Sequence, residues 1–379
     1  MSKAMRRPEW IRQAGLGALL ILSVLAGGFT ETAAGAGFAV AEPGYRYTFP
    51  RDHGPHPAYE TEWWYYTGRV TAESGRSYGY QLTFFRRGID AAGVRKNPSK
   101  WALKNVFLAH FALTDETEKT FAFAEKTNRP GGGAAGADAK RFKVWNGPWF
   151  AEEKEGVIVL SAVSGDRSIM LRLKPSRAPV IHGPDGVSRK GPGKTQTSHY
   201  YSWPRMETTG TLTINHRLET VKGLSWMDHE FGSGQLSENQ VGWDWFGLHL
   251  DNGMDLMLYR IRRADGTVEP ASSGTLIEPD GRVTHLPIEA FTYSIRDGWT
   301  SPKTRTAYPS RWVIAVPDHG IELTVTPTVA DQELVTAQST RVTYWEGSVL
   351  VKGRARDAAV SGHGYAELTG YAESLGKRF

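Results

Sequence analysis

Short runs in which apolar and polar residues alternate fill most of the chain after residue 60, and this pattern is typical of β-strands. The clearest runs are Glu62–Val70, Ser77–Arg86, Asn105–Leu113 and Val157–Ala162, which are rich in aromatic and β-branched residues. Glu73–Arg76 has the composition of a hairpin turn between the first two runs. Helical periodicity is weak throughout. The pattern therefore predicts an all-β protein.

A degenerate repeat relates the two halves of the chain. Glu62–Gly68 leads through a turn to Leu82–Arg87, and Trp243–Gly247 leads through a turn to Leu256–Arg260. Both units contain an aromatic strand, a turn, an apolar strand and an arginine. The second turn is Asp-Asn-Gly, a strong hairpin signal. Any two hairpins share some features, but the matched order of residue types favours a true repeat.

Length and composition agree with two β domains. The chain has 379 residues, which is long for one domain and comfortable for two. Its 42 glycines and 20 prolines supply many turns, and its 13 tryptophans indicate large apolar cores or cavities. We predict consecutive antiparallel barrels over residues 42–222 and 223–379, because closure removes sheet edges and encloses an apolar cavity.

Residues 1–41 have the pattern of a signal peptide. Four basic residues precede an apolar run from about Ala14 to Phe29, and Ala39-Val40-Ala41 resembles a cleavage site. An uncleaved membrane anchor is the alternative, but the apolar run is short for a span. We therefore expect a periplasmic or secreted protein with no membrane span after cleavage.

The charge and the missing cysteines exclude several classes of function. The formal net charge is +5, and it falls to +3 without residues 1–41, which hold four basic and two acidic residues. This balance is too mild to indicate a nucleic-acid partner. The chain has no cysteine, so disulfides, thiolate metal sites and a cysteine nucleophile are excluded. No G-x-S-x-G motif supports a serine hydrolase.

Eight segments, in order along the chain, resemble the AttH-like, carotenoid 1,2-hydratase-like proteins. They are Phe49–Gly68, Phe107–Asp115, His182–Gly191, His199–Met206, Ser225–Leu236, Gly242–Gly253, Tyr344–Gly347 and Gly364–Tyr371. The resemblance implies two lipocalin-like β-barrels, in agreement with the repeat. It also implies hydratase or hydrolase chemistry on an apolar molecule such as a terpenoid, carotenoid or lipid, or an association with an ABC transporter permease. Many members carry Trp where this chain has Phe231.

The strongest candidate chemistry lies in Gly223–Gly266. Asp228, His229 and Glu230 follow Trp226 and precede Trp243 and Trp245. Carboxyl groups among large aromatic rings are costly to desolvate, and their pKa values move toward catalytic ranges. Hydration of an alkene requires a protonated acid and a group that stabilises the cation, and aromatic faces stabilise cations. The resemblance likewise implies that the acidic residue of this motif donates the proton.

We therefore predict Asp228 as the proton donor, with Glu230 and His229 in supporting roles. Strand alternation places Asp228 and Glu230 on one face and His229 on the other, so we do not expect all three to be internal. The predicted substrate-binding residues are Trp226, Trp243, Trp245, Trp64, Tyr65 and Tyr200. The structural alternative is that an acid of this motif closes a turn or pairs with a buried arginine.

A second cluster of polar residues precedes the first strand and contains Asp52, His53, His56, Glu60 and Glu62. Two histidines at i and i+3 could ligate zinc. The segment is irregular, however, and offers no clear third ligand. We favour hydrogen-bonded histidines that close one end of the first barrel, and we expect no metal and no cofactor.

Two hypotheses follow. The first is an exported enzyme that acts on a hydrophobic small molecule by acid–base chemistry at Asp228. The second is a non-catalytic, lipocalin-like periplasmic carrier or chaperone for an apolar ligand, working beside an ABC transporter. The fold alone does not choose between them, because lipocalin-like barrels also bind ligands without chemistry.

Overall fold

Strands make up most of the computed structural model, which describes residues 37–89, 97–99, 101–234 and 236–376. The helical elements in this part of the chain are short 3-10 helices: η2 (Arg51–His53), η3 (Gly131–Gly133), η4 (Pro184–Gly186), η5 (Ile288–Ala290) and η6 (Pro317–His319). The all-β prediction is confirmed. Among the described residues, no helix has the length and apolarity needed to span a bilayer. The predicted signal peptide lies outside the described residues, apart from residues 37–41.

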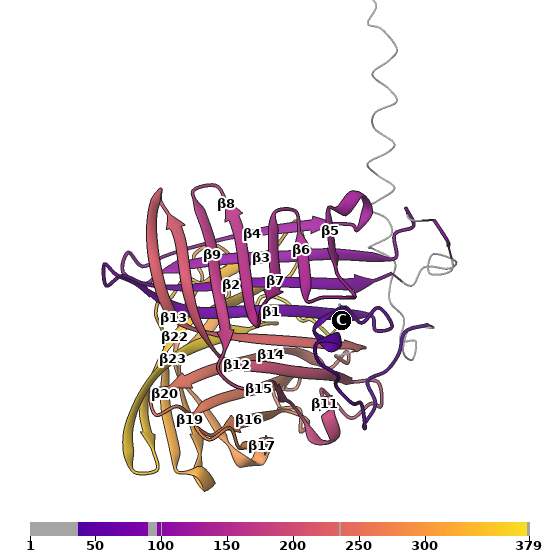
Figure 1. Cartoon of the computed structure of the whole chain (residues 1–379). Helices are drawn as coiled ribbons and strands as arrows, with labels where there is room; N and C mark the ends of the chain where they lie inside the picture. Colours follow the sequence, from indigo (N-terminus) through magenta and orange to yellow (C-terminus); the bar gives the residue numbers. More distant parts are fainter. Residues whose placement is uncertain (1–36, 90–96, 100, 235, 377–379) are drawn as a thin grey trace, which may run out of the picture. The chain divides into compact units, whose positions relative to one another are not determined.

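The first sheet has 13 strands, and its main path runs β4-β3-β2-β1-β13-β12-β9-β8-β7-β6-β5, with β10 and β11 paired to β12 (Figure 1). The bounds are β1 (Thr61–Ala72), β2 (Ser77–Gly88), β3 (Asn105–Asp115), β4 (Thr120–Asn128), β5 (Ala135–Ala137), β6 (Lys143–Asn146), β7 (Trp149–Lys154), β8 (Val157–Ser164), β9 (Arg167–Pro175), β10 (Val180–Ile181), β11 (Ser188–Arg189), β12 (Thr197–Ile214) and β13 (Arg217–Ser233).

The second sheet has 10 strands in the order β17-β16-β15-β14-β23-β22-β20-β19-β18, with β21 paired to β22. The bounds are β14 (Gln240–Leu250), β15 (Asp255–Arg263), β16 (Ser273–Ile277), β17 (Val283–Pro287), β18 (Thr292–Thr300), β19 (Ala307–Val316), β20 (Ile321–Pro327), β21 (Glu333–Val335), β22 (Thr343–Ala355) and β23 (Ala358–Leu368).

The two sheets share one plan. In each, the first four strands form a meander and the first strand pairs with the last, so the break in the barrel lies between consecutive strands, β4 and β5 or β17 and β18. The repeated hairpins occupy equivalent places. Glu62 lies opposite Arg86 and Asp244 lies opposite Arg260. The acidic side chain is ion-paired to the arginine in both, at 2.8 Å and 3.9 Å.

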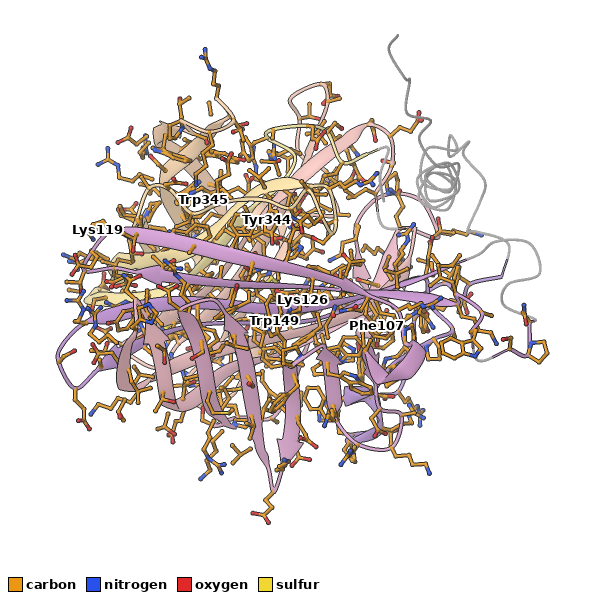
Figure 2. The ribbon with its side chains drawn as sticks, turned by 90° about the horizontal axis from the view of Figure 1, so that it is seen from above. Phe107, Lys119, Lys126, Trp149, Tyr344 and Trp345 are labelled. Carbon is orange, nitrogen blue, oxygen red and sulfur yellow. The ribbon has the colours of Figure 1, made fainter. Side chains whose placement is uncertain are left out.

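Side chains cross the break in the first sheet. Lys126 of β4 lies over the Trp149 ring of β7, 4.8 Å from its centroid (Figure 2). The amide of Asn146 on β6 accepts a hydrogen bond from Asn128 of β4 and donates one to the Phe107 carbonyl of β3. These contacts bring the two edges together where no strand pairing does, so the first sheet is nearly closed.

Both faces of β1 and β13 are covered, which decides where the candidate site lies. One face points into the core of the first sheet, where Trp64, Tyr66 and Met227 are buried. The opposite face packs against β14, β22 and β23 in a separate aromatic cluster that includes Tyr65 and Trp226. A strand that is buried on both faces keeps few exposed positions, and β13 is buried without interruption from Ser225 to Ser233.

The two sheets approach closely where a glycine permits it. A Cβ on Gly79 of β2 would lie 2.7 Å from the Ser348 Cβ and 2.9 Å from the Tyr365 hydroxyl oxygen. Polar contacts accompany this packing, because Gln81 donates to the Glu346 carboxylate at 2.7 Å and the Ser348 hydroxyl donates to Glu116 at 2.9 Å.

The predicted domain boundary at residue 222 falls within β13, which belongs to the first sheet up to Ser233. The described residues, from 37 to 376, all belong to one compact unit. Whether the two halves fold as separate domains is not tested by this geometry, and the division at 222 stays a prediction.

Candidate functional site

Asp228 lies at the middle of β13, on the face that meets the second sheet. Its direct neighbours in the sheet are Tyr65 of β1 and Ser202 of β12. The side chain is buried, with 4% exposure. Trp245 reaches the same place from β14 of the second sheet. Strand pairing within one sheet and packing between two sheets thus bring these groups together.

Three donors hold the Asp228 carboxyl group. The Trp226 indole donates at 2.6 Å and the Tyr200 hydroxyl at 2.7 Å, and the Ser202 hydroxyl donates to the oxygen that Trp226 also contacts. The Trp245 indole in turn donates to the Tyr200 hydroxyl at 3.1 Å. No described residue forms an ion pair with Asp228, so the structural alternative of an arginine partner does not apply to it.

Burial raises the pKa of Asp228 from 3.8 to about 7, although the hydrogen bonds from Ser202, Tyr200 and Trp226 lower it and the Glu230 charge raises it. The carboxyl group is therefore available as a proton donor near neutral pH. When it is protonated, its hydrogen can go to the Ser202 hydroxyl, which lies 2.6 Å from His182 Nε2. His182 Nδ1 lies 2.8 Å from the Thr275 hydroxyl, and burial lowers the His182 pKa to about 3. A neutral His182 thus continues the hydrogen-bonded chain.

Glu230, two residues along the same face, has a different partner. Lys190 lies 3.0 Å from its carboxylate, and the Ser198 hydroxyl donates to the same oxygen. The Lys190 ammonium also lies 4.3 Å from the Tyr259 ring centroid. Burial lowers the Lys190 pKa, but the charge of Glu230 outweighs it and the net pKa is raised. Glu230 is therefore an ion-pair partner, which suits electrostatic support better than proton donation.

Two further carboxyl groups from the second sheet border this site. Glu346 of β22 and Glu367 of β23 are cross-strand neighbours. The Trp243 indole donates to Glu367 at 2.8 Å, and burial raises the Glu367 pKa to about 7. Burial also raises the pKa of Glu346 well above its ordinary value. With Asp228 and Glu230 they form a group of four acids, three of them buried and Glu367 half-buried, which we call the interface acids.

His229 points the other way, into the core of the first sheet. Its Nε2 lies 2.9 Å from Glu62, and its ring stacks on Trp64 at 4.8 Å. The expectation that Asp228, His229 and Glu230 would not all be internal is wrong, because both faces of β13 are covered. Trp64 likewise lies on the opposite face of β1 from Tyr65. Neither His229 nor Trp64 contacts Asp228.

The predicted histidine segment belongs to this second location. His56 Nδ1 lies 2.8 Å from Glu62, and His56 Nε2 lies 3.3 Å from Asp52. Arg86 donates to Glu62 at 2.8 Å, and Tyr201 links His229 to His53. We call the set formed by Asp52, His53, His56, Glu62, Arg86, Tyr201 and His229 the histidine network.

Within this network, His56, Glu62 and His229 offer ligand atoms within 4.8 Å of one another and could hold a metal ion. The Arg86 guanidinium opposes a cation there, and each of the three ligand atoms already has a hydrogen-bond partner. Burial raises the Glu62 pKa, but hydrogen bonds from His229 and His56 and the Arg86 charge outweigh it, so the net pKa is lowered and Glu62 is ionised. His56 and His229 are each hydrogen-bonded to Glu62, and the expectation that no metal binds here stays a prediction.

The structure thus brings together Asp228, Glu230, Trp226, Trp245, Tyr65 and Tyr200 from the predicted set, with Trp243 bordering them through Glu367. It adds residues that sequence reasoning missed: Lys190, Ser202, His182, Glu346 and Glu367. All five lie in segments that carry the family resemblance, in Tyr344–Gly347, Gly364–Tyr371, His182–Gly191 and His199–Met206. Their position in these segments is the sequence signal that could have identified them.

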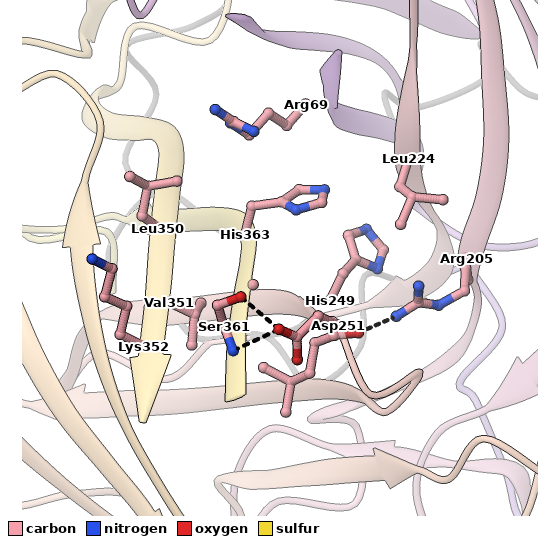
Figure 3. Close-up of a pocket in the computed structure, with 12 residues that line it drawn as sticks. Arg69, Arg205, Leu224, His249, Asp251, Leu350, Val351, Lys352, Ser361 and His363 are labelled. Atoms are coloured by element: carbon pink, nitrogen blue, oxygen red, sulfur yellow. Dashed lines mark hydrogen bonds between the residues drawn. The ribbon is translucent and has the colours of Figure 1, made fainter. Parts of the chain in front are cut away.

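A cavity of about 360 Å³ opens between the sheets near this site (Figure 3). Its lining comes from β1, β12 and β13 of the first sheet and from β14, β22 and β23 of the second. A void of about 10 Å³ shares Arg69, His249 and His363 with it and is also lined by Trp226. Trp226, which donates to Asp228, thus lines the smaller void but not the cavity, and Asp228 lines neither. Trp243 and Trp245 do not line either space.

Comparison with known proteins supports the assignment of fold and family. The AttH-like family pattern matches residues 40–371. A crystal structure from Nitrosomonas europaea assigned to AttH has 31% identity and a TM-score of 0.79, covering 88% of this chain and 99% of that one. None of the curated proteins compared with the chain matches it.

Two more distant structures share the fold. Kievitone hydratase from Nectria haematococca has 15% identity and a TM-score of 0.66, covering 91% of this chain and 97% of that one. A structure of CghA with Sch210972 has 14% identity and a TM-score of 0.52, covering 89% of this chain and 97% of that one. The match over residues 40–371 and the Nitrosomonas relative together show that the chain belongs to the AttH-like family.

Proposed function

We propose that the protein is a hydratase-like enzyme that adds water to an alkene of a hydrophobic substrate, with Asp228 as the proton donor. The observation that carries this proposal is a buried carboxyl group without an ion pair, held among aromatic side chains by Ser202, Tyr200 and Trp226. A fold shared with kievitone hydratase agrees with this reaction class but does not establish it.

The proposed reaction needs no cofactor. The Asp228 O–H bond breaks as its proton forms a C–H bond with one alkene carbon, which leaves a carbocation at the other carbon. Water forms a C–O bond with that cation and returns a proton to the Asp228 carboxylate. Trp226 and Tyr200 direct an N–H and an O–H donor at Asp228, and Trp245 directs its N–H at Tyr200. A cation that forms against the face of one of these rings would be stabilised by about 0.5–2 kcal/mol. Ser202 and His182 keep the carboxyl group oriented.

The direct test is hydration of a panel of isoprenoid alkenes in isotopically labelled water, followed by mass spectrometry. We expect a product heavier by one labelled water. Asp228→Asn should lower turnover by about two to four orders of magnitude while ligand binding persists, because general acid catalysis contributes that much. Asp280→Asn, at an exposed turn, is the matched control. Full turnover by Asp228→Asn would overturn the role of Asp228.

The second candidate is a non-catalytic carrier for an apolar ligand that works beside an ABC transporter. The observation in its favour is that Asp228 lines neither the cavity nor the smaller void and that donors occupy both Asp228 oxygens. Native mass spectrometry of protein purified from its own host distinguishes the two. A retained, chemically unchanged apolar molecule that survives incubation favours the carrier, and a hydrated product favours the enzyme.

We also propose that the protein is exported, on the basis of the signal-like pattern in residues 1–41. Fractionation of the host cell, followed by N-terminal sequencing, tests this. The expected result is a periplasmic or secreted chain that begins at Glu42. A cytoplasmic chain that begins at Met1 would contradict the proposal.

A further inference from the structure

The cavity between the sheets has a charge character that the proposed reaction does not use. Three of its lining residues are basic, namely Arg69, Arg205 and Lys352, and Asp251 is the one acidic residue of the lining. Two histidines, His249 and His363, also line it, with ring centroids 5.4 Å apart (Figure 3). We call this space the basic cavity.

Hydrogen bonds hold the two arginines of the cavity in place, but each guanidinium keeps one nitrogen for a further hydrogen bond. Arg69 donates to Glu116 through Nε and Nη2, and Arg205 donates through the same atoms to Asp255 and to the Leu250 and Met254 carbonyls. Neither arginine uses Nη1 in a contact with the described residues. An arginine that an acid of the protein already holds is preorganised to receive a ligand, because its side chain is already ordered.

Other polar groups of the basic cavity lack partners. Lys352 is exposed and takes part in no ion pair within the described part of the chain. The His363 Nε2 is buried and has no hydrogen-bond partner among the described residues. The Asp251 carboxylate is already occupied, since it accepts hydrogen bonds from the Ser361 amide and hydroxyl. A buried nitrogen without a partner is costly unless a ligand or water completes it.

The potential in the basic cavity is positive. Burial, together with the charges of His249, Arg69 and Arg205, lowers the pKa of His363 to about 3. Glu116 and Asp255 lie behind the arginines and offset part of their charge, but these neighbouring cations still disfavour a proton on His363. The same positive charges would attract an anion that binds beside His363.

The basic cavity also has apolar walls. Leu224, Leu350 and Val351 line it. Its volume of about 360 Å³ lies within the range of small-molecule sites. The smaller void that Trp226 lines has about 10 Å³, which is room for one water and not for a chain. A ligand that matches both the basic and the apolar lining carries a charged group and an apolar part.

We propose that the basic cavity binds the carboxylate of an amphipathic organic acid whose apolar part packs against Leu224, Leu350 and Val351. This inference rests on the cavity itself and does not depend on the proposed function. The carboxylate would accept hydrogen bonds from Arg69, Arg205 and His363, with Lys352 at the outer rim.

The test compares two probes that differ only in the head group, farnesoic acid and farnesol. Their dissociation constants are measured with the full chain by calorimetry and by quenching of tryptophan fluorescence. We expect the acid to bind about tenfold more tightly than the alcohol, because hydrogen bonds to a charged group are stronger than those to a neutral one. Equal affinities for acid and alcohol would overturn the proposal.

Lys352→Met is the informative variant, since Lys352 is exposed and its loss leaves no buried acid unpaired. We expect about threefold weaker binding of farnesoic acid and unchanged binding of farnesol. Arg354→Met is the matched control, because it removes a positive charge from the next outward position of β22 without touching the cavity. Equal weakening by both variants would indicate long-range charge alone and would contradict the site. His363→Phe should weaken acid binding more than alcohol binding, and the reverse order would also contradict it.

These outcomes separate the carboxylate site from the proposed function, because binding needs no turnover. Asp228→Asn should bind both probes as the unchanged protein does. Acid-selective binding without any hydration activity would keep the basic cavity and reject the hydratase. Hydration activity without acid selectivity would keep the hydratase and reject the carboxylate site.

Discussion

Two acids on one strand face show how local partners decide the chemistry of a residue. Asp228 and Glu230 are two positions apart on β13 and equally buried. Lys190 compensates the charge of Glu230, whereas Asp228 has only neutral donors. Sequence alone could identify both as candidates, because each lies among aromatic residues. It could not assign their roles, since Lys190 reaches the site from a segment 40 residues away in the chain.

The raised pKa of Asp228 makes a prediction about stability. The folded protein holds this proton up to about pH 7, whereas the unfolded chain loses it near 3.8. The folded state therefore binds more protons between these values, and its stability falls as the pH rises through this window. Asp228→Asn removes the titration. Relative to the unchanged protein it should gain on the order of 4 kcal/mol between pH 3 and pH 8.

Urea unfolding of both proteins at several pH values measures this difference. The amide replaces one acceptor oxygen with a donor, so Asp228→Asn carries a cost that does not depend on pH. The prediction concerns only the change with pH. Asp280→Asn, which makes the same change at an exposed turn, serves as the control. A pH-independent difference for Asp228→Asn would show that folding does not raise the pKa of Asp228.

At the level of elements, the strands could be predicted well because their signals are local. The expected runs at 62–70, 77–86, 105–113 and 157–162 lie within β1, β2, β3 and β8. The hairpin turns were marked by glycine, asparagine and aspartate. A local pattern cannot show that a strand is buried on both faces, as β1 and β13 are. A second sheet that buries their outer face is a property of tertiary packing, and it explains why Trp64 and His229 were grouped with residues of the opposite face.

The histidine network fastens the segment before β1 onto the first sheet, and Arg86 is its central cation. Arg86 is 2% exposed, and it pairs with the fully buried Glu62 and donates to the His56 and Tyr59 carbonyls. Arg86→Met should destabilise the protein by about 3–5 kcal/mol, because it leaves Glu62 buried without its partner. The free energy of unfolding in denaturant measures this.

Arg87→Met provides the control from the next position of β2. Arg87 pairs with Glu60, but the two side chains are 31% and 20% exposed. Solvent screens such a pair, so its loss should cost only about 0–1 kcal/mol. A similar cost for both variants would mean that the Arg86–Glu62 pair contributes no more than a surface pair, and that the histidine network does not depend on it.

For the whole molecule, the informative fact is that the candidate site belongs to neither sheet alone. Asp228 and Glu230 come from the first sheet, whereas Trp245, Glu346 and Glu367 come from the second. The repeat in the sequence predicted two similar halves, but it carried no information about which faces meet. Glu346 and Glu367 follow Asp228 by more than 100 residues, and only the packing of β22 and β23 against β1 and β2 brings them near.

The close approach of the two sheets at Gly79 is the feature that most directly tests this arrangement. Gly79→Ala should destabilise the protein by about 1–3 kcal/mol, because the new methyl group would overlap the Ser348 side chain and the Tyr365 hydroxyl. The strain would separate the strands that carry Glu346 and Glu367 from those that carry Asp228. Ligand binding should therefore weaken in the same variant, even though Gly79 contacts neither cavity.

Gly298→Ala is the control, because the nearest atom to its new Cβ would be the Tyr308 carbonyl oxygen at an ordinary 3.5 Å. This exposed strand position should tolerate alanine without loss. In a double variant, Ser348→Gly should recover part of the stability that Gly79→Ala loses, since it removes two of the three close contacts. A coupling energy near zero between positions 79 and 348 would show that the sheets do not meet there. A substantial coupling energy would place the interface acids at the junction of the two sheets.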